Sequence, residues 1–363
     1  MSFLKNSWYC TGWSPDVGEK PVHRKVIGED IVLFRDASGK VNAISDKCPH
    51  RFAPLHKGQV VGDTVVCPYH GLRFDGTGTC VLNPHGNGQV PPRQHTDSYP
   101  VEERGGTIWI WMGDPAKADP DQIVDTSFLA DTGTYVSISG HHEVKAHYFL
   151  AVDNLLDLTH AQFLHPETVY GVPATDRWTV HLSDKAKAKE EAGQEVWFDE
   201  DETSLTAHYK LRDKPTPPMW EAISGYKTVD MYVASTWLAP ANMVFYVEVD
   251  SKVPGEEAFT MKALHFMTPI DDMNFYYFYA VGWDLNIDDK AIPDRVHEIA
   301  KQTIIDEDGP MLEDCQAYMG DTSDLFSLRP LLLQTDGVAI KARRRMEKLV
   351  EAQNSGSDAR EAA

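Results

Sequence analysis

Four side chains that bind soft or borderline metals lie within residues 48–70, whose sequence is CPHRFAPLHKGQVVGDTVVCPYH. Cys48 and His50 form a Cys-x-His pair at its start, and Cys67 and His70 form a Cys-x-x-His pair at its end. Each pair follows a short run of strand-forming residues and leads into a turn. Thiolate and imidazole groups bind zinc, copper and iron–sulfur clusters. The spacing therefore predicts a metal site built on two loops.

Three interpretations of these residues are open: a structural zinc site, four unrelated turn residues, and an iron–sulfur cluster. Zinc sites usually pair Cys with Cys and His with His, whereas each pair here mixes one sulfur with one nitrogen. Two thiolates on one iron and two imidazoles on the other are the ligand set of a Rieske [2Fe–2S] cluster. Gly71 permits a tight turn after His70, and Pro49 and Pro68 restrict the backbone after each cysteine. These features favour the cluster.

A second group of ionisable residues lies in AVDNLLDLTHAQFLHPETV, residues 151–169. On a helix, Asp153, Asp157 and His160 would share one face at i, i+4 and i+7. His165 can join His160 on one metal only if the helix ends or bends between them, and Pro166 favours such an end. Two histidines at this spacing suit a 2-His-1-carboxylate iron site. The alternative is two hydrogen-bonded histidines at a helix end.

The carboxylate that would complete such a site cannot be chosen from spacing alone. A helical pattern over residues 295–316 contains several acidic residues: Asp306, Glu307, Asp308, Glu313 and Asp314. An N-cap role is a further alternative for Asp308, because Pro310 suits the first turn of a helix.

Composition limits the class of protein. The chain of 363 residues has a formal net charge of −21 and a pI near 5.0, which argues against nucleic acid or an anionic membrane surface as a partner. The N-terminal residues lack an apolar signal core, and no window is apolar enough to span a membrane. The few cysteines suit a reducing compartment. We therefore expect a cytoplasmic enzyme without disulfides.

The chain divides near residue 118 according to its patterns. Residues 1–118 alternate short strand-forming runs with turn residues, which is typical of an all-β domain. Residues 119–350 combine helical patterns around 145–165 and 291–318 with long strand-forming runs between them. This indicates an α+β domain, an antiparallel sheet flanked by helices. Residues 351–363 are small and polar and are expected to be disordered.

The motifs carry a resemblance to a known family. CPHRFAPL, CPYHGLRFDG, NPHGNG and IWIWMGDP resemble the Rieske domain of ring-hydroxylating and demethylating oxygenases, and DNLLDLTHAQFLH resembles their mononuclear iron motif. Within this superfamily the chain is similar to the vanillate and dicamba O-demethylase oxygenase group, and the likeness covers nearly all of it. The resemblance implies an N-terminal Rieske domain and a helix-grip-like catalytic domain with a mononuclear Fe(II).

The resemblance also implies roles for single residues. It identifies Asp308 as the third iron ligand. Gly309 and Pro310 depart from the related sequences, so Asp306 is kept as a reserve ligand. It implies a head-to-tail homotrimer, in which Asp157 bridges His70 of one subunit to the iron histidine of the next, with Asn154 assisting. Such an acidic residue can hold two imidazoles in place.

The implied reaction is O2- and NADH-dependent O-demethylation of a methoxyaromatic acid resembling vanillate, which yields a phenol and formaldehyde. Electrons would come from NADH through a separate reductase or ferredoxin, because no nucleotide-binding fingerprint occurs here. Substrate contacts are expected from His265 by resemblance, from the aromatic residues Trp237, Phe245, Tyr246 and Tyr279, and near Ile299, where related proteins have a tryptophan. The alternatives are hydroxylation of an alkyl or ring C–H bond, and a Rieske electron carrier without oxygenase activity.

Overall fold

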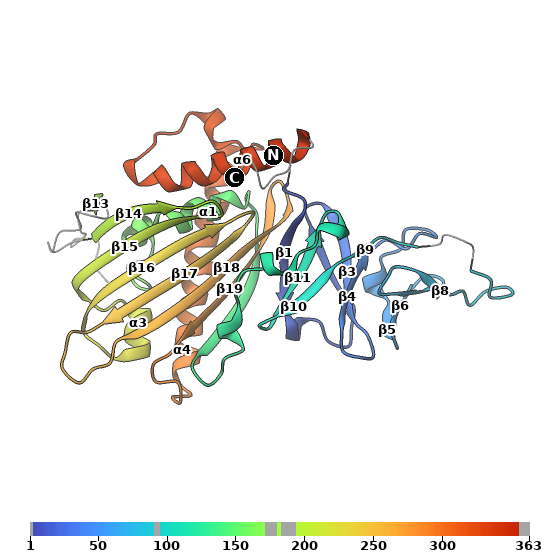
Figure 1. Ribbon diagram of the computed structural model, residues 1–363, viewed down its shortest axis with the longest axis horizontal. Coiled ribbons are helices and arrows are strands. Elements are labelled where there is room, and N and C mark those ends of the chain that lie inside the picture. Colours follow the sequence, from blue (N-terminus) through green and yellow to red (C-terminus); the bar gives the residue numbers. More distant parts are fainter. Residues whose placement is uncertain (1–2, 91–94, 171–179, 183–193, 356–363) are drawn as a thin grey trace. The chain divides into compact units, whose positions relative to one another are not determined.

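The computed structural model describes residues 3–90, 95–170, 180–182 and 194–355 (Figure 1). The chain forms two compact units. The N-terminal unit comprises Lys5–Ala130 and Thr268–Asp271, and the C-terminal unit contains the residues from Asp131 onward except that short segment. The division after Ala130 comes later than the predicted boundary at residue 118.

The N-terminal unit is all-β, as predicted. Its strands form three antiparallel sheets, in the orders β1-β11-β10, β2-β3-β4-β9 and β5-β6-β7-β8. The strands are β1 (Ser7–Trp13), β2 (Val22–Val26), β3 (Glu29–Arg35), β4 (Val41–Ser45), β5 (Gln59–Val61), β6 (Thr64–Val66), β7 (Arg73–Asp75), β8 (Cys80–Leu82), β9 (Ser98–Tyr99), β10 (Val101–Arg104) and β11 (Thr107–Met112). Short 3-10 turns lie at Ser14–Asp16, Leu55–Lys57, Pro115–Lys117, Pro120–Gln122 and Ser127–Leu129.

The C-terminal unit is built on an eight-stranded sheet in the order β12-β19-β18-β17-β16-β15-β14-β13. The strands are β12 (Val136–Val144), β13 (Val180–Leu182), β14 (Gln194–Glu200), β15 (Ser204–Pro215), β16 (Thr228–Leu238), β17 (Asn242–Asp250), β18 (Phe259–Asp271) and β19 (Asn274–Trp283). The consecutive strands from β14 to β18 pair antiparallel with one another, as β12 does with β19, while the edge strand β13 runs parallel to β14. The predicted antiparallel sheet is thus confirmed.

Helices accompany this sheet (Figure 1). They are α1 (Phe149–Leu156), α2 (Ala161–Leu164), α3 (Pro218–Ser224), α4 (Ile292–Lys301), α5 (Gly309–Met319) and α6 (Gly337–Ser355), with a π-helix at Gln302–Asp308 and 3-10 turns at Leu158–His160, Leu325–Leu328 and Gln334–Asp336. Helix α4, the π-helix and α5 follow one another without a break. Helix α1 contacts β16 and α6, and α6 also contacts β15.

Burial on the strands follows the period of two that distinguishes the faces of a sheet. In β16 every second residue from Val229 to Trp237 is buried, and the residues between are partly exposed. The buried face packs with α1, α3, α4 and α6 in one large hydrophobic cluster. Strand β19 is buried at every position after its first residue, and β18 is buried without interruption from Ala263 to Pro269, so these stretches are covered on both faces. The site described below is held between this sheet and its helices.

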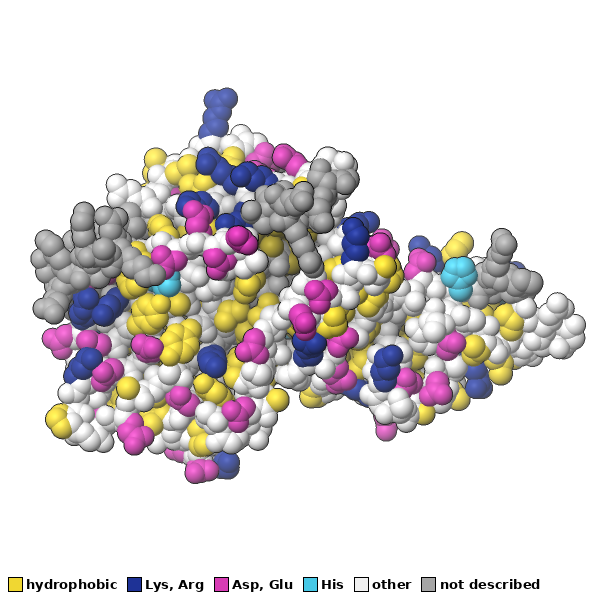
Figure 2. Space-filling model, in the orientation of Figure 1, with side chains coloured by type: hydrophobic (Ala, Val, Ile, Leu, Met, Phe, Trp, Pro, Cys, Tyr) yellow, Lys and Arg dark blue, Asp and Glu magenta, His cyan; other side chains and the backbone are white. Residues whose placement is uncertain are grey.

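Helix α6 continues to Ser355, five residues into the segment that the sequence predicts to be disordered, and the remaining residues lie outside the described ones. No helix within the described part of the chain is long and apolar enough to cross a membrane. Acidic side chains are spread over the face shown in Figure 2, whereas several Lys and Arg side chains gather over α6.

Candidate metal centres and active-site cavity

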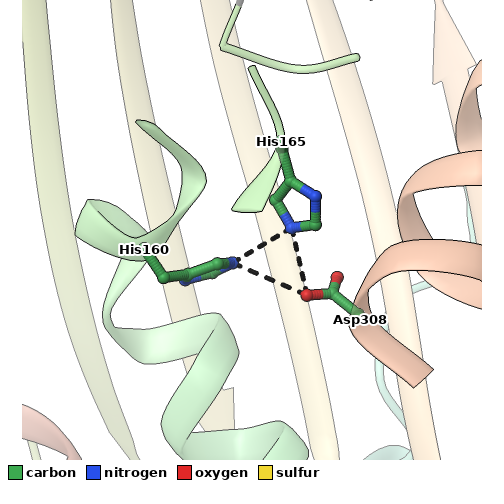
Figure 3. A group of neighbouring side chains, drawn as sticks. All are labelled: His160, His165 and Asp308. Carbon is green, nitrogen blue, oxygen red and sulfur yellow. Dashed lines mark hydrogen bonds and ion pairs between the residues drawn. The ribbon is translucent and has the colours of Figure 1, made fainter. Parts of the chain in front are cut away.

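Three candidate ligands from distant parts of the chain meet in the C-terminal unit (Figure 3). The Nε2 atoms of His160 and His165 lie 3.2 Å apart, and Oδ1 of Asp308 lies 3.0 Å from His165 Nε2 and 3.7 Å from His160 Nε2. His165 and Asp308 are buried, and His160 is partly exposed. We call these three residues the triad.

The hydrogen bonds around the triad fit a metal ion. Nδ1 of His160 lies 2.6 Å from the main-chain oxygen of Asp157, and Nδ1 of His165 lies 2.7 Å from Oε2 of Glu307. Both partners accept hydrogen bonds, so a neutral imidazole places its hydrogen on Nδ1 and its lone pair on Nε2. Two lone pairs and a carboxylate oxygen then face one another, an arrangement that a divalent cation stabilises. The set is the 2-His-1-carboxylate triad of non-haem iron sites.

The chain leaves helical geometry after α1, and this break positions His160. Helix α1 ends at Leu156, and the Asp157 side chain accepts a hydrogen bond from the Thr159 amide to begin the next turn. Tyr209, on β15, donates its hydroxyl hydrogen to the Leu156 carbonyl at 2.7 Å and accepts from the Leu158 amide at 2.8 Å. The chain therefore turns without leaving these two main-chain groups unpaired. Asp153, Asp157 and His160 do not share one helix face, contrary to the sequence prediction.

The second histidine follows a one-turn helix. Helix α2 ends at Leu164, and the backbone of His165 leaves helical geometry before Pro166. This agrees with the predicted helix end, since a residue before proline avoids the α region. The ring of His165 makes an angle of 76° with that of His160, with centroids 5.1 Å apart.

Asp308 is the last residue of the π-helix. Its backbone is helical and its side chain makes no capping hydrogen bond, so the N-cap alternative is not observed. The reserve candidate, Asp306, is exposed and is not part of the triad. π-helical turns are rare and frequently mark functional sites. Here the π-helix carries Asp308 to the two histidines.

Two further side chains form hydrogen bonds with the triad. Asn154, on α1, donates through Nδ2 to Asp308 Oδ1 at 3.0 Å and lies 3.3 Å from His160 Nε2. Glu307 accepts from His165 Nδ1 and from the Thr168 hydroxyl at 2.8 Å, and its other oxygen accepts from Gln302 at 3.0 Å. A role for Asn154 is implied by the resemblance, whereas Glu307 is one of several acidic residues in its segment of the sequence. Its position beside Asp308 was the one signal available.

The carboxylate of Asp157 is engaged within its own subunit. Oδ1 accepts from the amide and hydroxyl of Thr159, at 3.0 and 2.6 Å, and Oδ2 accepts from the Thr335 hydroxyl at 2.9 Å. Its contact with His160 is through the main-chain oxygen. The bridging role between subunits therefore stays a prediction.

The two Cys/His loops of the N-terminal unit have matching backbones. The Cys48 carbonyl accepts from the Phe52 amide at 2.8 Å, and the Cys67 carbonyl accepts from the Gly71 amide at 3.0 Å. Phe52 and Gly71 both have positive φ, 59° and 71°. The tight turn predicted at Gly71 is thus observed, and Phe52 adopts the same conformation, which is uncommon for a bulky residue.

The four side chains on these loops fit a Rieske cluster. Cys48 and Cys67 are buried in one small core, and the rings of His50 and His70 lie 4.6 Å apart. Burial, and then the neighbouring Cys67 thiol, raise the pKa of Cys48 to about 11. Nδ1 of His70 is buried without a hydrogen-bond partner among the described residues. A bound iron deprotonates a coordinating thiol and accepts a nitrogen lone pair, so a cluster would resolve both features.

A cavity of about 150 Å³ adjoins the triad and lies within the C-terminal unit. His160, His165 and Asp308 form part of its wall, together with mostly apolar residues of β15 to β19, α3 and α4. Two of the candidate substrate residues, His265 and Phe245, line it, and so does Tyr277, which the sequence did not single out.

The other predicted substrate residues lie elsewhere. Tyr246 follows Phe245 on β17, so its side chain is on the opposite face, where its hydroxyl donates to Glu248 at 2.9 Å. Trp237 is fully buried beside Phe149, farther along β16 than the residues that line the cavity. Ile299 packs against the core, while its neighbour Ala300 reaches the cavity wall.

Comparisons with known proteins agree with these sites. Residues 7–100 match the Rieske [2Fe-2S] domain, and residues 144–352 match the vanillate O-demethylase oxygenase C-terminal domain. The oxygenase component of dicamba O-demethylase from Stenotrophomonas maltophilia is 33% identical over 96% of this chain and 98% of its own length. The oxygenase component of chloroacetanilide N-alkylformylase from Rhizorhabdus wittichii is 34% identical over 97% of each chain.

Solved structures of dicamba monooxygenase are similar as well. The structure bound to 3,6-dichlorosalicylic acid has a TM-score of 0.85 at 32% identity and covers 98% of this chain and 99% of its own. The structure with non-heme iron and dicamba has a TM-score of 0.79 at 31% identity, with the same coverage. The chain therefore belongs to the Rieske monooxygenases with a vanillate O-demethylase oxygenase C-terminal domain, and it is an oxygenase component whose cofactors are a [2Fe–2S] cluster and a mononuclear iron.

Proposed function

We propose that this oxygenase removes the methyl group of a methoxyaromatic compound, giving a phenol and formaldehyde. The observation that carries the proposal is the largely apolar cavity directly beside the triad. The volume of about 150 Å³ suits a small aromatic ring. Relatives named for O-demethylation of dicamba and vanillate cover nearly the whole chain.

The atoms and electrons of this reaction balance. One oxygen atom of O2 enters the methyl C–H bond, the other leaves as water, and NADH supplies two electrons. The resulting hemiacetal breaks its bond between the hydroxylated carbon and the ether oxygen, which releases formaldehyde and leaves that oxygen on the ring. When bound, the mononuclear iron would activate O2 and the Rieske cluster would supply electrons to it.

The protein contributes orientation and exclusion of water. His160, His165 and Asp308 would hold the iron, and Glu307 keeps the hydrogen of His165 on Nδ1, so that Nε2 remains a ligand. Asn154 donates to the carboxylate oxygen that faces the histidines and thereby orients it. The apolar wall limits access of water to the reacting carbon.

We further propose a homotrimer in which Asp157 links the two metal centres of neighbouring subunits. Leu331, Leu332 and Leu333 are exposed, and Leu331 is 88% exposed. They directly precede the turn whose Thr335 donates to Asp157. An apolar surface next to the residue expected to face another subunit supports the association. Sedimentation should give three times the mass of the chain, and a monomer at working concentration would contradict it.

Electrons are proposed to come from NADH through a separate reductase or ferredoxin. The chain lacks the nucleotide-binding fingerprint such a partner would carry. The proposal also places the enzyme in the cytoplasm, since none of the five cysteines forms a disulfide and four of them are buried.

The test combines metal analysis with product analysis. Anaerobically purified protein should contain about three irons and two acid-labile sulfides per chain. With NADH, O2 and a compatible reductase, formaldehyde and phenol should form from methoxyarenes in equal amounts. Asp308→Ala is the matched control, which should keep the visible spectrum of the cluster and make neither product.

Each alternative has its own result. Two irons per chain would indicate an electron carrier. Stable alcohols from alkylarenes, with no formaldehyde from any methoxyarene, would replace demethylation by hydroxylation.

A further inference from the structure

The side chains that the structure describes around the cavity do not suit a negatively charged substrate. Among the cavity residues that the structure describes, none is Lys or Arg. The walls formed by the sheet carry apolar side chains: Leu211, Met231, Val233, Val247, Met261 and Val281. An aromatic carboxylate placed there would lose its hydration without gaining an opposite charge, and such burial is strongly unfavourable.

The triad cannot supply the missing charge. With Fe(II) bound, the Asp308 carboxylate offsets one of the two positive charges of the ion, and the charge that remains lies beside the methoxy group rather than beside a ring carboxylate. In demethylation the methoxy carbon must lie next to the triad, so a carboxylate elsewhere on the ring points toward the apolar wall.

Beside the triad histidines and the indole of Trp220, His265 is a nitrogen-bearing side chain of the described wall, and it is neutral at pH 7. Burial lowers its pKa to about 4. Its Nδ1 lies 3.1 Å from the hydroxyl of Tyr277, which is also buried. Burial raises the pKa of Tyr277 well above its usual value, so this hydroxyl keeps its hydrogen. When Tyr277 donates that hydrogen to Nδ1, Nε2 carries the imidazole hydrogen.

Neighbouring rings hold this donor in place. Phe245 contacts His265 edge to face, with centroids 4.9 Å apart, and both line the cavity. The geometry thus offers a neutral hydrogen-bond donor from β18 in a largely apolar wall, and the other polar groups of the described wall outside the triad, such as the Trp220 indole and the Thr303 hydroxyl, are uncharged as well. A neutral donor binds an ether, carbonyl or phenol oxygen well, but it does not neutralise a carboxylate.

We propose that the substrate is an uncharged aromatic ether with an oxygen that accepts a hydrogen bond from His265, rather than an aromatic carboxylate. This inference rests on the proposed demethylation. It replaces the methoxyaromatic acid expected from the sequence with an uncharged methoxyaromatic compound.

The test compares the binding of two compounds that differ in charge and hardly in shape: meta-methoxybenzoate and meta-methoxybenzamide. Calorimetric titration of the anaerobic protein with its metals in place measures binding without turnover. The amide should bind about 100-fold more tightly at pH 7.5. Equal or tighter binding of the carboxylate would overturn the proposal.

The pH dependence gives a second, independent readout. If only the protonated acid enters the cavity, the affinity for methoxybenzoate should rise about tenfold for each unit that the pH falls from 8 toward 6. The amide is the control, because its affinity should not change over this range. A benzoate affinity independent of pH would show that the anion itself binds.

Variants test the neutral donor. His265→Leu should weaken binding of the amide about fivefold to tenfold and leave binding of meta-methylanisole, which lacks the second oxygen, unchanged. Tyr246→Phe, on the opposite face of the sheet, is the matched control and should change neither affinity. Equal weakening of both ligands by His265→Leu would exclude the hydrogen bond.

Failure of the two proposals can be told apart. If the amide binds tightly but yields no formaldehyde during turnover, demethylation is wrong while the preference for a neutral substrate stands. If methoxybenzoate binds tightly and yields formaldehyde, the preference is wrong while demethylation stands.

Discussion

The hydroxyl of Tyr209 is expected to hold the iron site together, and Tyr209→Phe tests this expectation. The change removes one oxygen and preserves the ring. It leaves the Leu156 carbonyl and the Leu158 amide without the partner that now lies at 2.7 and 2.8 Å. Tyr209 is 1% exposed and Leu156 is fully buried, so solvent does not readily replace that partner.

The expected loss of stability follows from these two groups. An unsatisfied buried main-chain group costs about 1–3 kcal/mol, and two of them cost about 2–6 kcal/mol. Because Tyr209 borders the cavity, a water molecule can replace some of the lost hydrogen bonding. We therefore expect the free energy of unfolding to fall by about 3 kcal/mol. For a unit of the size of the C-terminal unit, this loss of stability corresponds to a fall in Tm of about 6–12 °C.

Calorimetry of the full chain measures the transition of the catalytic unit, and metal analysis measures the iron that it retains. Mononuclear iron should be lost in preference to the cluster, because the turn before His160 is the part that loosens. Tyr246→Phe removes a hydroxyl that donates to the exposed Glu248; it is the control and should shift stability by less than about 0.5 kcal/mol. A Tyr209→Phe protein with the parental Tm and a full complement of iron would refute the reasoning.

Four further changes probe the remaining contacts. Glu307→Gln should weaken iron binding about 10–100-fold in competition with a chelator while the visible cluster spectrum stays unchanged, and parental iron retention would contradict its role. Arg343→Met leaves the carboxylate of Asp153 without its buried partner and should lower the free energy of unfolding by about 3 kcal/mol, with partial recovery when Asp153→Asn is added; denaturant titration measures both. Burial lowers the pKa of His147 to about 3, so between that value and about 6.5 the unfolded chain binds one more proton and stability falls as the pH falls. His147→Asn should therefore reduce the slope of unfolding free energy against pH by about 1.4 kcal/mol per unit in that window, and an unchanged slope would exclude this histidine as the cause. Asp157→Asn should keep both metal sites filled and slow the single-turnover reoxidation of the cluster, whereas a parental rate would argue against the bridge.

Local motifs allowed the sequence alone to predict the Rieske ligands and the pair of histidines. Cys48 and His50 lie on one turn, and Cys67 and His70 lie on another, so each pair depends on the conformation of a few residues. Such short-range geometry is encoded by neighbouring Gly and Pro residues. The division into an all-β unit and an α+β unit likewise follows from the periods of the local patterns.

The third ligand depended on tertiary structure. Asp306, Glu307 and Asp308 are consecutive, and successive residues of a helix point in directions roughly 100° apart. Only the docking of the helix that contains the π-turn decides which carboxylate meets the histidines. The structure turns Asp308 to the two Nε2 atoms and Glu307 to the Nδ1 of His165, while Asp306 remains exposed.

The cavity wall likewise could not be derived from the sequence. Alternation along β17 separates Phe245 from Tyr246, but it does not say which face meets the helices. On β16, Met231 and Trp237 share a face, yet only Met231 reaches the cavity. The sequence determined the metals and the chemical class of the enzyme through residues close together in the chain. The charge and shape of the substrate site arise where five strands and the helices beside them converge, so only the packing of distant segments decided them.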